Sequence, residues 1–298
     1  MTRHIRTYMQ ATEPAGTELV AQIDAQIERL RARLAAIRSI VVVASGKGGV
    51  GKSFVAATLA AGLADRGLKV GALDADVNGP SLARMLGAVH TRLRVDADGV
   101  HPAHTRAGCA LMSSDFLLDT PDAPLRWRGP ESAGFVWQSA LETGMLREFL
   151  SDVCWGELDT LVIDTPPGTD KIARILPLLP SISAVVLVTT PSAVANAAVA
   201  RSCTQLRDAG VKNIGVVHNM AGYFCPACRT ISPLFDSVAG VADDTPFGTT
   251  WATLPFDPRA AAAIDAGRPL PGDSPVTVAI SRIIASLDLP GPAPEQQP

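Results

Sequence analysis

The fold is decided by an apolar run and the glycine-rich loop that follows it, Ile40-Val41-Val42-Val43-Ala44-Ser45-Gly46-Lys47-Gly48-Gly49-Val50-Gly51-Lys52-Ser53. The run has the length and β-branched content of a buried strand, and a helical pattern begins at Phe54. Glycines followed by a lysine and a serine at this spacing match the Walker A phosphate-binding loop. Glycine lets backbone N–H groups surround phosphate oxygens, and the N-terminus of the helix adds a favourable dipole. We therefore expect residues 46–53 to bind the phosphates of a nucleotide.

Two lysines and a serine of this loop are candidates for the chemistry. Lys52 can reach the β- and γ-phosphates, and the Ser53 hydroxyl can ligate Mg²⁺. Lys47 is an additional lysine, and with it the loop resembles the deviant Walker A loop of the nitrogenase-iron-protein and MinD class of P-loop ATPases (SIMIBI-type). The resemblance implies that Lys47 reaches across a dimer and supplies positive charge to the nucleotide of the partner. The alternative is a second phosphate contact within its own chain.

Two further apolar runs end in carboxylates, and α/β sheets bind ligands at the carboxyl ends of their strands. One run continues into Asp74 and Asp76, and the other into Asp164. We expect Asp76 to orient the attacking water and hold a Mg²⁺-bound water, Asp164 to serve Mg²⁺ in the Walker B role, and Asp74 to support the structure. The N–H of Gly168 is expected to sense the γ-phosphate from a switch loop. The alternative for each aspartate is an ordinary cap or turn former.

The base of the nucleotide is expected to be adenine. The guanine-specific pattern Asn-Lys-x-Asp does not occur in the chain. The candidate contacts with the base are Asn219, at the end of a later apolar run, and Asp257, in the segment Leu254-Pro255-Phe256-Asp257-Pro258. For Asn219, a cap at a turn or strand end is the alternative. ATP is therefore favoured over GTP as the cofactor.

Short apolar runs alternate with helical stretches over residues 39–287, which predicts one α/β ATPase domain. The expected strands are residues 40–44, 70–73, 161–163, 184–188 and 214–218. Uninterrupted β-branched strands separated by helices indicate a mostly parallel sheet with helices on both faces, the fold of a P-loop NTPase. Outside this domain we expect a flexible tail over residues 1–16, a helix over 17–38 and a disordered tail over 288–298.

An apolar stripe follows the expected N-terminal helix at spacings of three and four residues. It comprises Val20, Ile23, Ile27, Leu30, Leu34 and Ile37. We favour a helix that lays this stripe on the surface of its own domain, because about three heptads alone make a marginal coiled coil. A short coiled coil with a partner chain is the alternative.

Composition excludes several classes of protein. The 298 residues are 47% hydrophobic and 18% charged, which excludes a disordered chain. The net charge of −3 provides no overall positive field, so we expect neither nucleic acid nor a membrane as a partner. The apolar runs fall far short of the ~20 residues of a membrane span, and no secretory signal is visible, so we expect a cytoplasmic protein. The five cysteines are then thiols or metal ligands and not disulfides.

One pair of cysteines has the spacing of a metal or cluster site. In Cys225-Pro226-Ala227-Cys228, both thiolates can bind one centre. Tetrahedral sulfur sites need four ligands, and the remaining cysteines, Cys109, Cys154 and Cys203, are scattered singly. A symmetric dimer in which the two pairs meet on the two-fold axis would complete such a site. A redox dithiol, half of a zinc site and an incidental turn are the alternatives.

Six stretches of the sequence together match one family. They are residues 46–53, 74–81, 127–130 (Trp-Arg-Gly-Pro), 164–169, 219–228 and 255–269. The chain, over residues 39–287, resembles the Mrp/ApbC-type iron–sulfur cluster carriers, which are cytosolic P-loop ATPases. The resemblance implies a homodimer that binds ATP and hydrolyses it slowly. It also implies a bridging 4Fe–4S cluster on Cys225 and Cys228, which passes from a scaffold donor to recipient apoproteins.

The chain departs from that family in the expected switch loop, where Asp170 and Lys171 stand in place of the usual Gly-Asp. A rival hypothesis is a MinD- or ParA-like ATP-gated positioning or partition protein, which would bind a membrane or DNA through a basic surface. Residues 276–287 contain Arg282 as their only positive charge, which makes a poor basic anchor. The carrier is therefore the favoured function.

Overall fold

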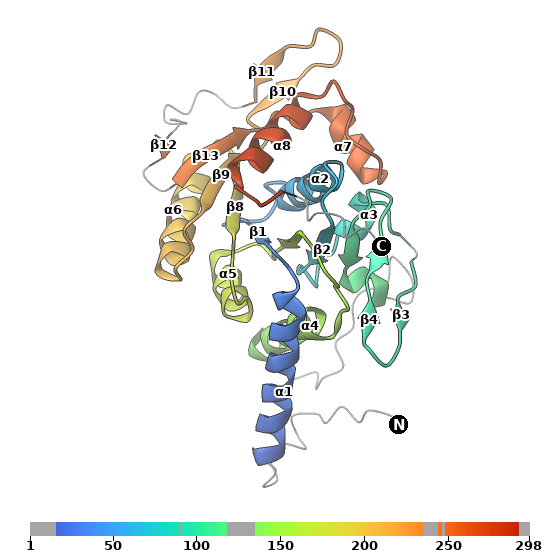
Figure 1. Cartoon of the computed structure of the whole chain (residues 1–298). Helices are drawn as coiled ribbons and strands as arrows, with labels where there is room; N and C mark the ends of the chain where they lie inside the picture. Colours follow the sequence, from blue (N-terminus) through green and yellow to red (C-terminus); the bar gives the residue numbers. More distant parts are fainter. Residues whose placement is uncertain (1–15, 90, 118–134, 235–243, 246–247, 292–298) are drawn as a thin grey trace.

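The computed structural model describes residues 16–89, 91–117, 135–234, 244–245 and 248–291. In these residues the main sheet has nine strands in the order β12-β13-β9-β8-β1-β7-β2-β6-β5 (Figure 1). The strands are β1 (Ile40–Ala44), β2 (Val70–Asp74), β5 (Ala103–His104), β6 (Ala110–Met112), β7 (Thr160–Asp164), β8 (Ala184–Thr189), β9 (Ile214–His218), β12 (Asp244–Thr245) and β13 (Gly248–Thr253). The edge strands β5 and β12 are antiparallel to their neighbours, and the other pairs are parallel. The mostly parallel sheet predicted from the sequence is confirmed.

The register brings the ends of the central strands to one edge of the sheet. β1 lies between β7 and β8, with Val43 opposite both Asp164 and Val186. β2 lies on the other side of β7, with Asp74 opposite Asp164. Because these strands are parallel, the loop that leaves β1 emerges at the edge where Asp164 lies on the neighbouring strand and Asp74 on the strand after it. The expected phosphate loop and the expected Mg²⁺ ligand Asp164 are therefore neighbours.

Helices cover both faces of the sheet (Figure 1). β1 explains why, because Val41 and Val43 are buried in the core of one face while Ile40 and Val42 are buried in the core of the other. The first face carries α2 (Lys52–Ala64), α3 (Leu82–Met85), α7 (Pro258–Asp265) and α8 (Pro275–Ser286). The second face carries α1 (Gly16–Ala35), α4 (Phe135–Asp152), α5 (Thr169–Ile175) and α6 (Ala193–Asp208).

Smaller elements complete the described part of the fold. They are the antiparallel pairs β3 (Arg94–Val95) with β4 (Val100–His101) and β10 (Gly222–Phe224) with β11 (Ile231–Pro233), and the short 3-10 helices η2 (Ser114–Leu117) and η3 (Leu176–Leu178). In Figure 1 the β10–β11 hairpin projects from the end of the molecule where α7 and α8 lie. Its turn contains Cys225 and Cys228.

The C-terminal half of α1 packs on α4. Leu30 and Leu34 are buried, whereas Ile23, earlier in the same stripe, is 38% exposed. The helix ends before the position that the apolar pattern predicted, because at Ile37 the backbone forms a β-bridge with Leu158. The later part of the stripe therefore lies on the chain's own domain.

Three features discussed above fall partly or wholly outside the described residues. These are the expected N-terminal tail, the Trp-Arg-Gly-Pro stretch at 127–130, and residues 292–298 of the expected C-terminal tail. Among the helices that the structure describes, none combines the length and the apolar character that crossing a bilayer requires.

Candidate nucleotide site and cysteine hairpin

The loop after β1 turns into α2 at a glycine whose backbone conformation and close contact both disfavour a side chain. Gly51, at the N-cap of α2, has a left-handed backbone with φ of 79°. A Cβ at this position would lie 2.2 Å from Nδ2 of Asn219. Within the loop, the hydroxyl of Ser45 donates to the carbonyl of Lys47 (3.0 Å), and the N–H of Val55 donates to the carbonyl of Gly51 (3.1 Å). The strand–loop–helix arrangement expected of a phosphate-binding loop is present.

Asn219 follows β9 directly and holds the phosphate loop. It is buried, and its Nδ2 donates to the carbonyl of Val50 (2.9 Å). Its backbone N–H donates to the carbonyl of Thr189 on β8 (2.7 Å). The side-chain bond restrains the loop, because losing it would leave a buried acceptor unsatisfied. The sequence did not indicate this contact; the expected contact between Asn219 and adenine stays a prediction.

A buried ion pair joins the loop to β7. The ammonium of Lys52 contacts Oδ1 of Asp164 and lies 3.4 Å from Oγ of Ser53. Lys52 is only 6% exposed, and Asp164 is fully buried. Burial raises the pKa of Asp164, and the neighbouring Lys52 acts to lower it. The three side chains that the sequence assigned to phosphate and Mg²⁺ are thus brought together.

The same corner of the site fits Mg²⁺. Oδ2 of Asp164 is buried and has no hydrogen-bond partner within the part of the chain that the structure describes. A carboxylate oxygen of this kind, beside the hydroxyl of Ser53, belongs to the hard oxygen donors that Mg²⁺ and its water ligands prefer. Binding of Mg²⁺ by Ser53 and Asp164 stays a prediction that this donor set supports.

Asp74 organises the loop after β2. Its carboxylate accepts backbone hydrogen bonds from Asp76 (3.2 Å), Ser81 (2.8 Å) and Leu82 (2.9 Å). Burial, and then the negative charge of Asp164, raise the pKa of Asp74 to about 7. These contacts agree with the supporting role expected for Asp74.

Asp76, the expected water-orienting residue, lies at the start of the same loop and is half-buried. Burial raises the pKa of its carboxyl, and the positive charge of Lys52 offsets part of the rise. Its carbonyl accepts a hydrogen bond from the N–H of Gly79 (3.2 Å). The carboxylate is thus electrostatically coupled to Lys52 and partly open to solvent, and its catalytic role stays a prediction.

Gly168 connects the loop after β7 to the phosphate loop. Its N–H donates to the carbonyl of Ser45 (3.0 Å), and its φ is 115°. The sequence predicts that this N–H senses the γ-phosphate. For such sensing, the N–H would give up its hydrogen bond to the carbonyl of Ser45 and donate to a phosphate oxygen. The sensing role of Gly168 stays a prediction.

Glu142 on α4 is a site residue that the sequence did not indicate. One of its carboxylate oxygens accepts a hydrogen bond from the amide of Asn78, in the loop after β2, and the other contacts the ammonium of Lys171 on α5. One carboxylate therefore ties together the loops that follow Asp76 and Asp164. The one signal for Glu142 in the sequence was Lys171, which departs from the usual family pattern. The ammonium of Lys171 is largely buried, and such a group needs an anionic partner.

Asp257 caps α7, and its carboxylate is fully engaged. It accepts hydrogen bonds from the backbone N–H of Arg259 (2.9 Å), the guanidinium of Arg259 (3.2 Å) and the hydroxyl of Ser274 (2.8 Å). Burial acts to raise the pKa of Asp257, but the hydrogen bonds from Ser274 and Arg259 outweigh it and lower the pKa. Arg259 also lies over the ring of Phe224, 5.4 Å from its centroid. Asp257 thus supports the base of the hairpin, and its contact with adenine stays a prediction.

The turn between β10 and β11 presents both cysteines of the pair. The N–H of Cys225 donates to the carbonyl of Thr230 (2.9 Å), and the N–H of Arg229 donates to the carbonyl of Cys225 (2.8 Å). Cys228 is exposed, and its Sγ lies 2.9 Å from Oγ1 of Thr230. Hydrogen bonds with Thr230, and then with Cys225, lower the pKa of Cys228 to about 7. Much of Cys228 is therefore thiolate near neutral pH, the form that binds metal.

The two cysteines of the hairpin are too few to form a four-sulfur centre by themselves. Within the described residues, no group of three or more His, Cys, Asp or Glu side chains could hold a metal ion. Cys109 and Cys203 are buried, and the Sγ of Cys154 contacts the carbonyl of Asp98 (3.3 Å). A four-sulfur centre on Cys225 and Cys228 therefore needs two more ligands from outside the described residues.

Exposed apolar side chains accompany the hairpin. The rings of Tyr223 and Phe256 stack with centroids 6.4 Å apart, and both remain partly exposed. Ile231 is 55% exposed and Leu234 is 44% exposed. Apolar side chains gathered beside a two-thiol turn suit a protein–protein contact.

Comparison with known proteins decides the family. The ParA family model, described as NUBPL iron-transfer P-loop NTPase, matches residues 36–287. The chain belongs to this family. The resemblance to iron–sulfur cluster carriers of the P-loop ATPase class, predicted from the sequence, is confirmed.

Several curated relatives and solved structures are similar to this chain over most of its length. The iron-sulfur cluster carrier protein of Methanocaldococcus jannaschii is 39% identical over 261 residues, which cover 87% of this chain and 86% of that protein. The cytosolic Fe-S cluster assembly factor NUBP2 homolog of Monosiga brevicollis is 41% identical over 249 residues, which cover 80% of this chain and 83% of that protein. The nucleotide-binding protein of Archaeoglobus fulgidus, solved in complex with ADP, superposes with a TM-score of 0.68 at 35% identity, over 81% of this chain and 91% of that one. The MinD ATPase of Pyrococcus furiosus superposes with a TM-score of 0.57 at 22% identity, over 84% of this chain and 98% of that one. At this identity the likeness shows the fold alone.

Proposed function

We propose that this protein binds ATP, hydrolyses it slowly, and carries a 4Fe–4S cluster as cargo between two copies of the chain. The observation that carries the proposal is the hairpin, where the exposed thiol of Cys228, with its pKa of about 7, lies beside Cys225. Two pairs of thiolates, one from each copy, meet on a two-fold axis and supply the four ligands of the cluster. The M. jannaschii relative named iron-sulfur cluster carrier protein supports the choice of cargo.

At the nucleotide, Lys52 exchanges its contact with Asp164 for the β- and γ-phosphates. Ser53 and Asp164 hold Mg²⁺, which when bound neutralises part of the phosphate charge. Asp76 orients the attacking water, and Lys47 supplies positive charge to the nucleotide of the partner. Support for the role of Lys47 is that no carboxylate in the described part of the chain pairs with its ammonium.

A short segment couples the nucleotide to the cargo. Asn219, which hydrogen-bonds the phosphate loop, stands just before β10 of the cysteine hairpin. The segment is anchored where the N–H of Ala221 donates to the carbonyl of Leu254 (3.0 Å) and the N–H of Phe224 donates to that of Phe256 (2.9 Å). We infer that ATP binding, by moving the phosphate loop, changes how the two hairpins meet and so favours loading or release of the cluster.

Partners of the carrier are a scaffold that donates the cluster and apoproteins that receive it, and the proposed compartment is the cytosol. The M. brevicollis relative is named a cytosolic Fe-S cluster assembly factor. The exposed side chains of Ile231 and Leu234 supply an apolar surface beside the thiols for such partners. Neither nucleic acid nor a membrane is proposed as a partner, since the net charge is −3. The rival positioning protein is supported by the fold alone.

Reconstitution with iron and sulfide in the absence of oxygen tests the proposal. The variants are Cys225→Ser/Cys228→Ser and, as a control, Cys154→Ser, which removes a half-buried thiol outside the hairpin. Visible absorbance, iron and sulfide counts, sedimentation and transfer to an apoprotein with and without ATP are measured. The wild-type protein and the control should form dimers with one cluster each and deliver it. A protein that stays monomeric in every nucleotide state, or a double variant that still binds and delivers cluster, would overturn the proposal.

A further inference from the structure

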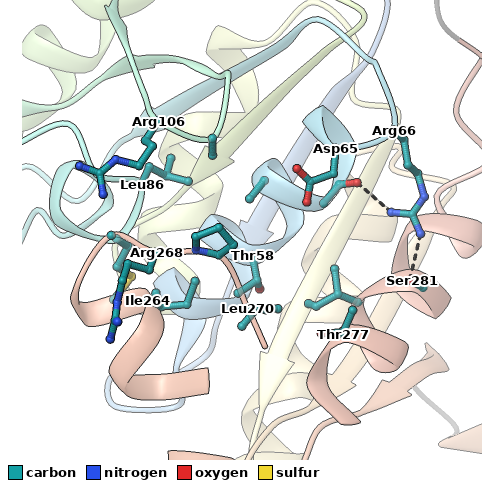
Figure 2. A pocket seen from close by; sticks show the side chains of 17 residues that line it. Thr58, Asp65, Arg66, Leu86, Arg106, Ile264, Arg268, Leu270, Thr277 and Ser281 are labelled. Carbon is teal, nitrogen blue, oxygen red and sulfur yellow. Dashed lines mark hydrogen bonds between the residues drawn. The ribbon is translucent and has the colours of Figure 1, made fainter. Parts of the chain in front are cut away.

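A separate cavity lies between the later turns of α2 and the first turns of α8 (Figure 2), and no residue of the phosphate loop lines it. Its volume is about 500 Å³, within the range of small-molecule sites. Small residues of α2, Thr58, Ala61 and Gly62, form one wall. Side chains of Thr277, Ile280 and Ser281 on α8 form the facing wall. None of these residues belongs to the nucleotide site or to the cysteine hairpin.

The cavity has an apolar middle. Its lining there comes from Leu86 after α3, Ile264 on α7, Leu270 in the connection to α8, and Ile280 on α8. Because these elements belong to the packed core of one face of the sheet, the walls are held by the fold. An apolar chain or ring placed there would remove apolar surface of the cavity from water.

The two ends of the cavity differ in charge. Figure 2 shows Arg106 and Arg268 at one end, and Asp65 with Arg66 at the other. The guanidinium of Arg66 is already engaged, donating to the carbonyl of Gly62 (2.8 Å) and to the hydroxyl of Ser281 (3.0 Å). Within the described residues, no carboxylate pairs with Arg106 or Arg268. One end therefore offers two exposed guanidinium groups, neither of them paired with a described carboxylate, next to an apolar surface.

We propose that this cavity binds an amphipathic anion, a small molecule with an apolar chain and one carboxylate or phosphate head. The head lies at the end of the cavity lined by Arg106 and Arg268, whose planar guanidinium groups match the oxygens of either anion. The chain lies along Leu86, Ile264 and Leu270. A neutral molecule of the same shape leaves both arginines unpaired, and a cation is repelled by them, so the charge of the head decides the specificity.

Calorimetric titration of the full-length protein tests the proposal with four probes of equal chain length. Decanoate and decyl phosphate should bind to one site, 1-decanol about tenfold more weakly, and decylamine more weakly still. The Arg106→Gln/Arg268→Gln variant should weaken decanoate about tenfold or more and leave 1-decanol unchanged. Arg282→Gln is the matched control, because Arg282 is an exposed arginine of α8 that does not line the cavity.

A variant that fills the cavity separates this site from other apolar surfaces. Ala61→Trp, checked for folding by circular dichroism, should abolish binding of all the probes. If it does not fold, the arginine variant decides alone, since both arginines are exposed. The proposal is wrong if the wild-type protein binds neither anion. It is equally wrong if 1-decanol binds as tightly as decanoate, or if the arginine variant binds decanoate as well as Arg282→Gln does.

Discussion

Replacing Asn219 with alanine should weaken the binding of every nucleotide by a common factor. The amide of Asn219 donates to the buried carbonyl of Val50 at 2.9 Å, and Asn219 is only 4% exposed. Leaving a buried acceptor unsatisfied costs about 1–3 kcal/mol. In the free protein, the loop can avoid this cost by leaving the conformation that binds phosphate, and only the molecules that keep that conformation bind nucleotide. The apparent affinity then falls by about 5-fold for a cost of about 1 kcal/mol and by about 150-fold for a cost of about 3 kcal/mol. The identity of the base does not enter, because the lost contact is to the loop.

Titrations with ADP, GDP and pyrophosphate, which has no base, measure this effect. The dissociation constants of all three ligands should rise by the same factor in Asn219→Ala, so the ratio of ADP to GDP affinity stays unchanged. Asn213→Ala is the matched control. Asn213 lies just before β9, at the end of the strand away from Asn219, and its amide donates to the carbonyl of Leu287 (3.3 Å). Its nucleotide affinities should match those of the wild-type protein.

The reasoning fails if Asn219→Ala loses ADP affinity while pyrophosphate binds as before. That result, or a loss of the preference for ADP over GDP, would mean that Asn219 reads the base and that its bond to Val50 does not hold the loop.

Three further predictions concern the hairpin, the switch loops and α1. The rate at which iodoacetamide alkylates Cys228 should rise with pH through a midpoint near 7, because the lowered pKa produces thiolate well below pH 9. In Thr230→Val this midpoint should move upward, and an unchanged midpoint would exclude Thr230 as the cause of the lowered pKa. Glu142→Ala should speed amide hydrogen exchange in both loops that Glu142 joins, since the hydrogen bond from Asn78 and the ion pair with Lys171 are both lost. Faster exchange in one loop alone would contradict the link. Leu34→Ala should lower the free energy of unfolding by about 2–5 kcal/mol in denaturant titrations, whereas a loss below about 1 kcal/mol would mean that α1 is not part of the core.

The sequence alone was sufficient for the parts of this protein that depend on local chain pattern. The run of β-branched residues at 40–44 and the glycine-rich loop after it predicted β1, the loop and α2, because strand length, glycine positions and the helix start are short-range properties. The carboxylates of Asp74 and Asp164 were predicted at the edge where ligands bind, because parallel strands align their ends. The Cys-x-x-Cys spacing indicated a metal or cluster site without deciding which.

Tertiary structure alone decided how those parts contact one another. Asn219 holds Val50 across 169 residues of chain, and Asn78 meets Glu142 across 64, so no local pattern could reveal either bond. The cavity flanked by Arg106 and Arg268 likewise exists only after α2, α7 and α8 have packed. The preference of a short segment for a strand, a turn or a helix depends on its own residues. The hydrogen-bond partner of a buried amide or carboxylate depends instead on how the whole sheet and its helices pack.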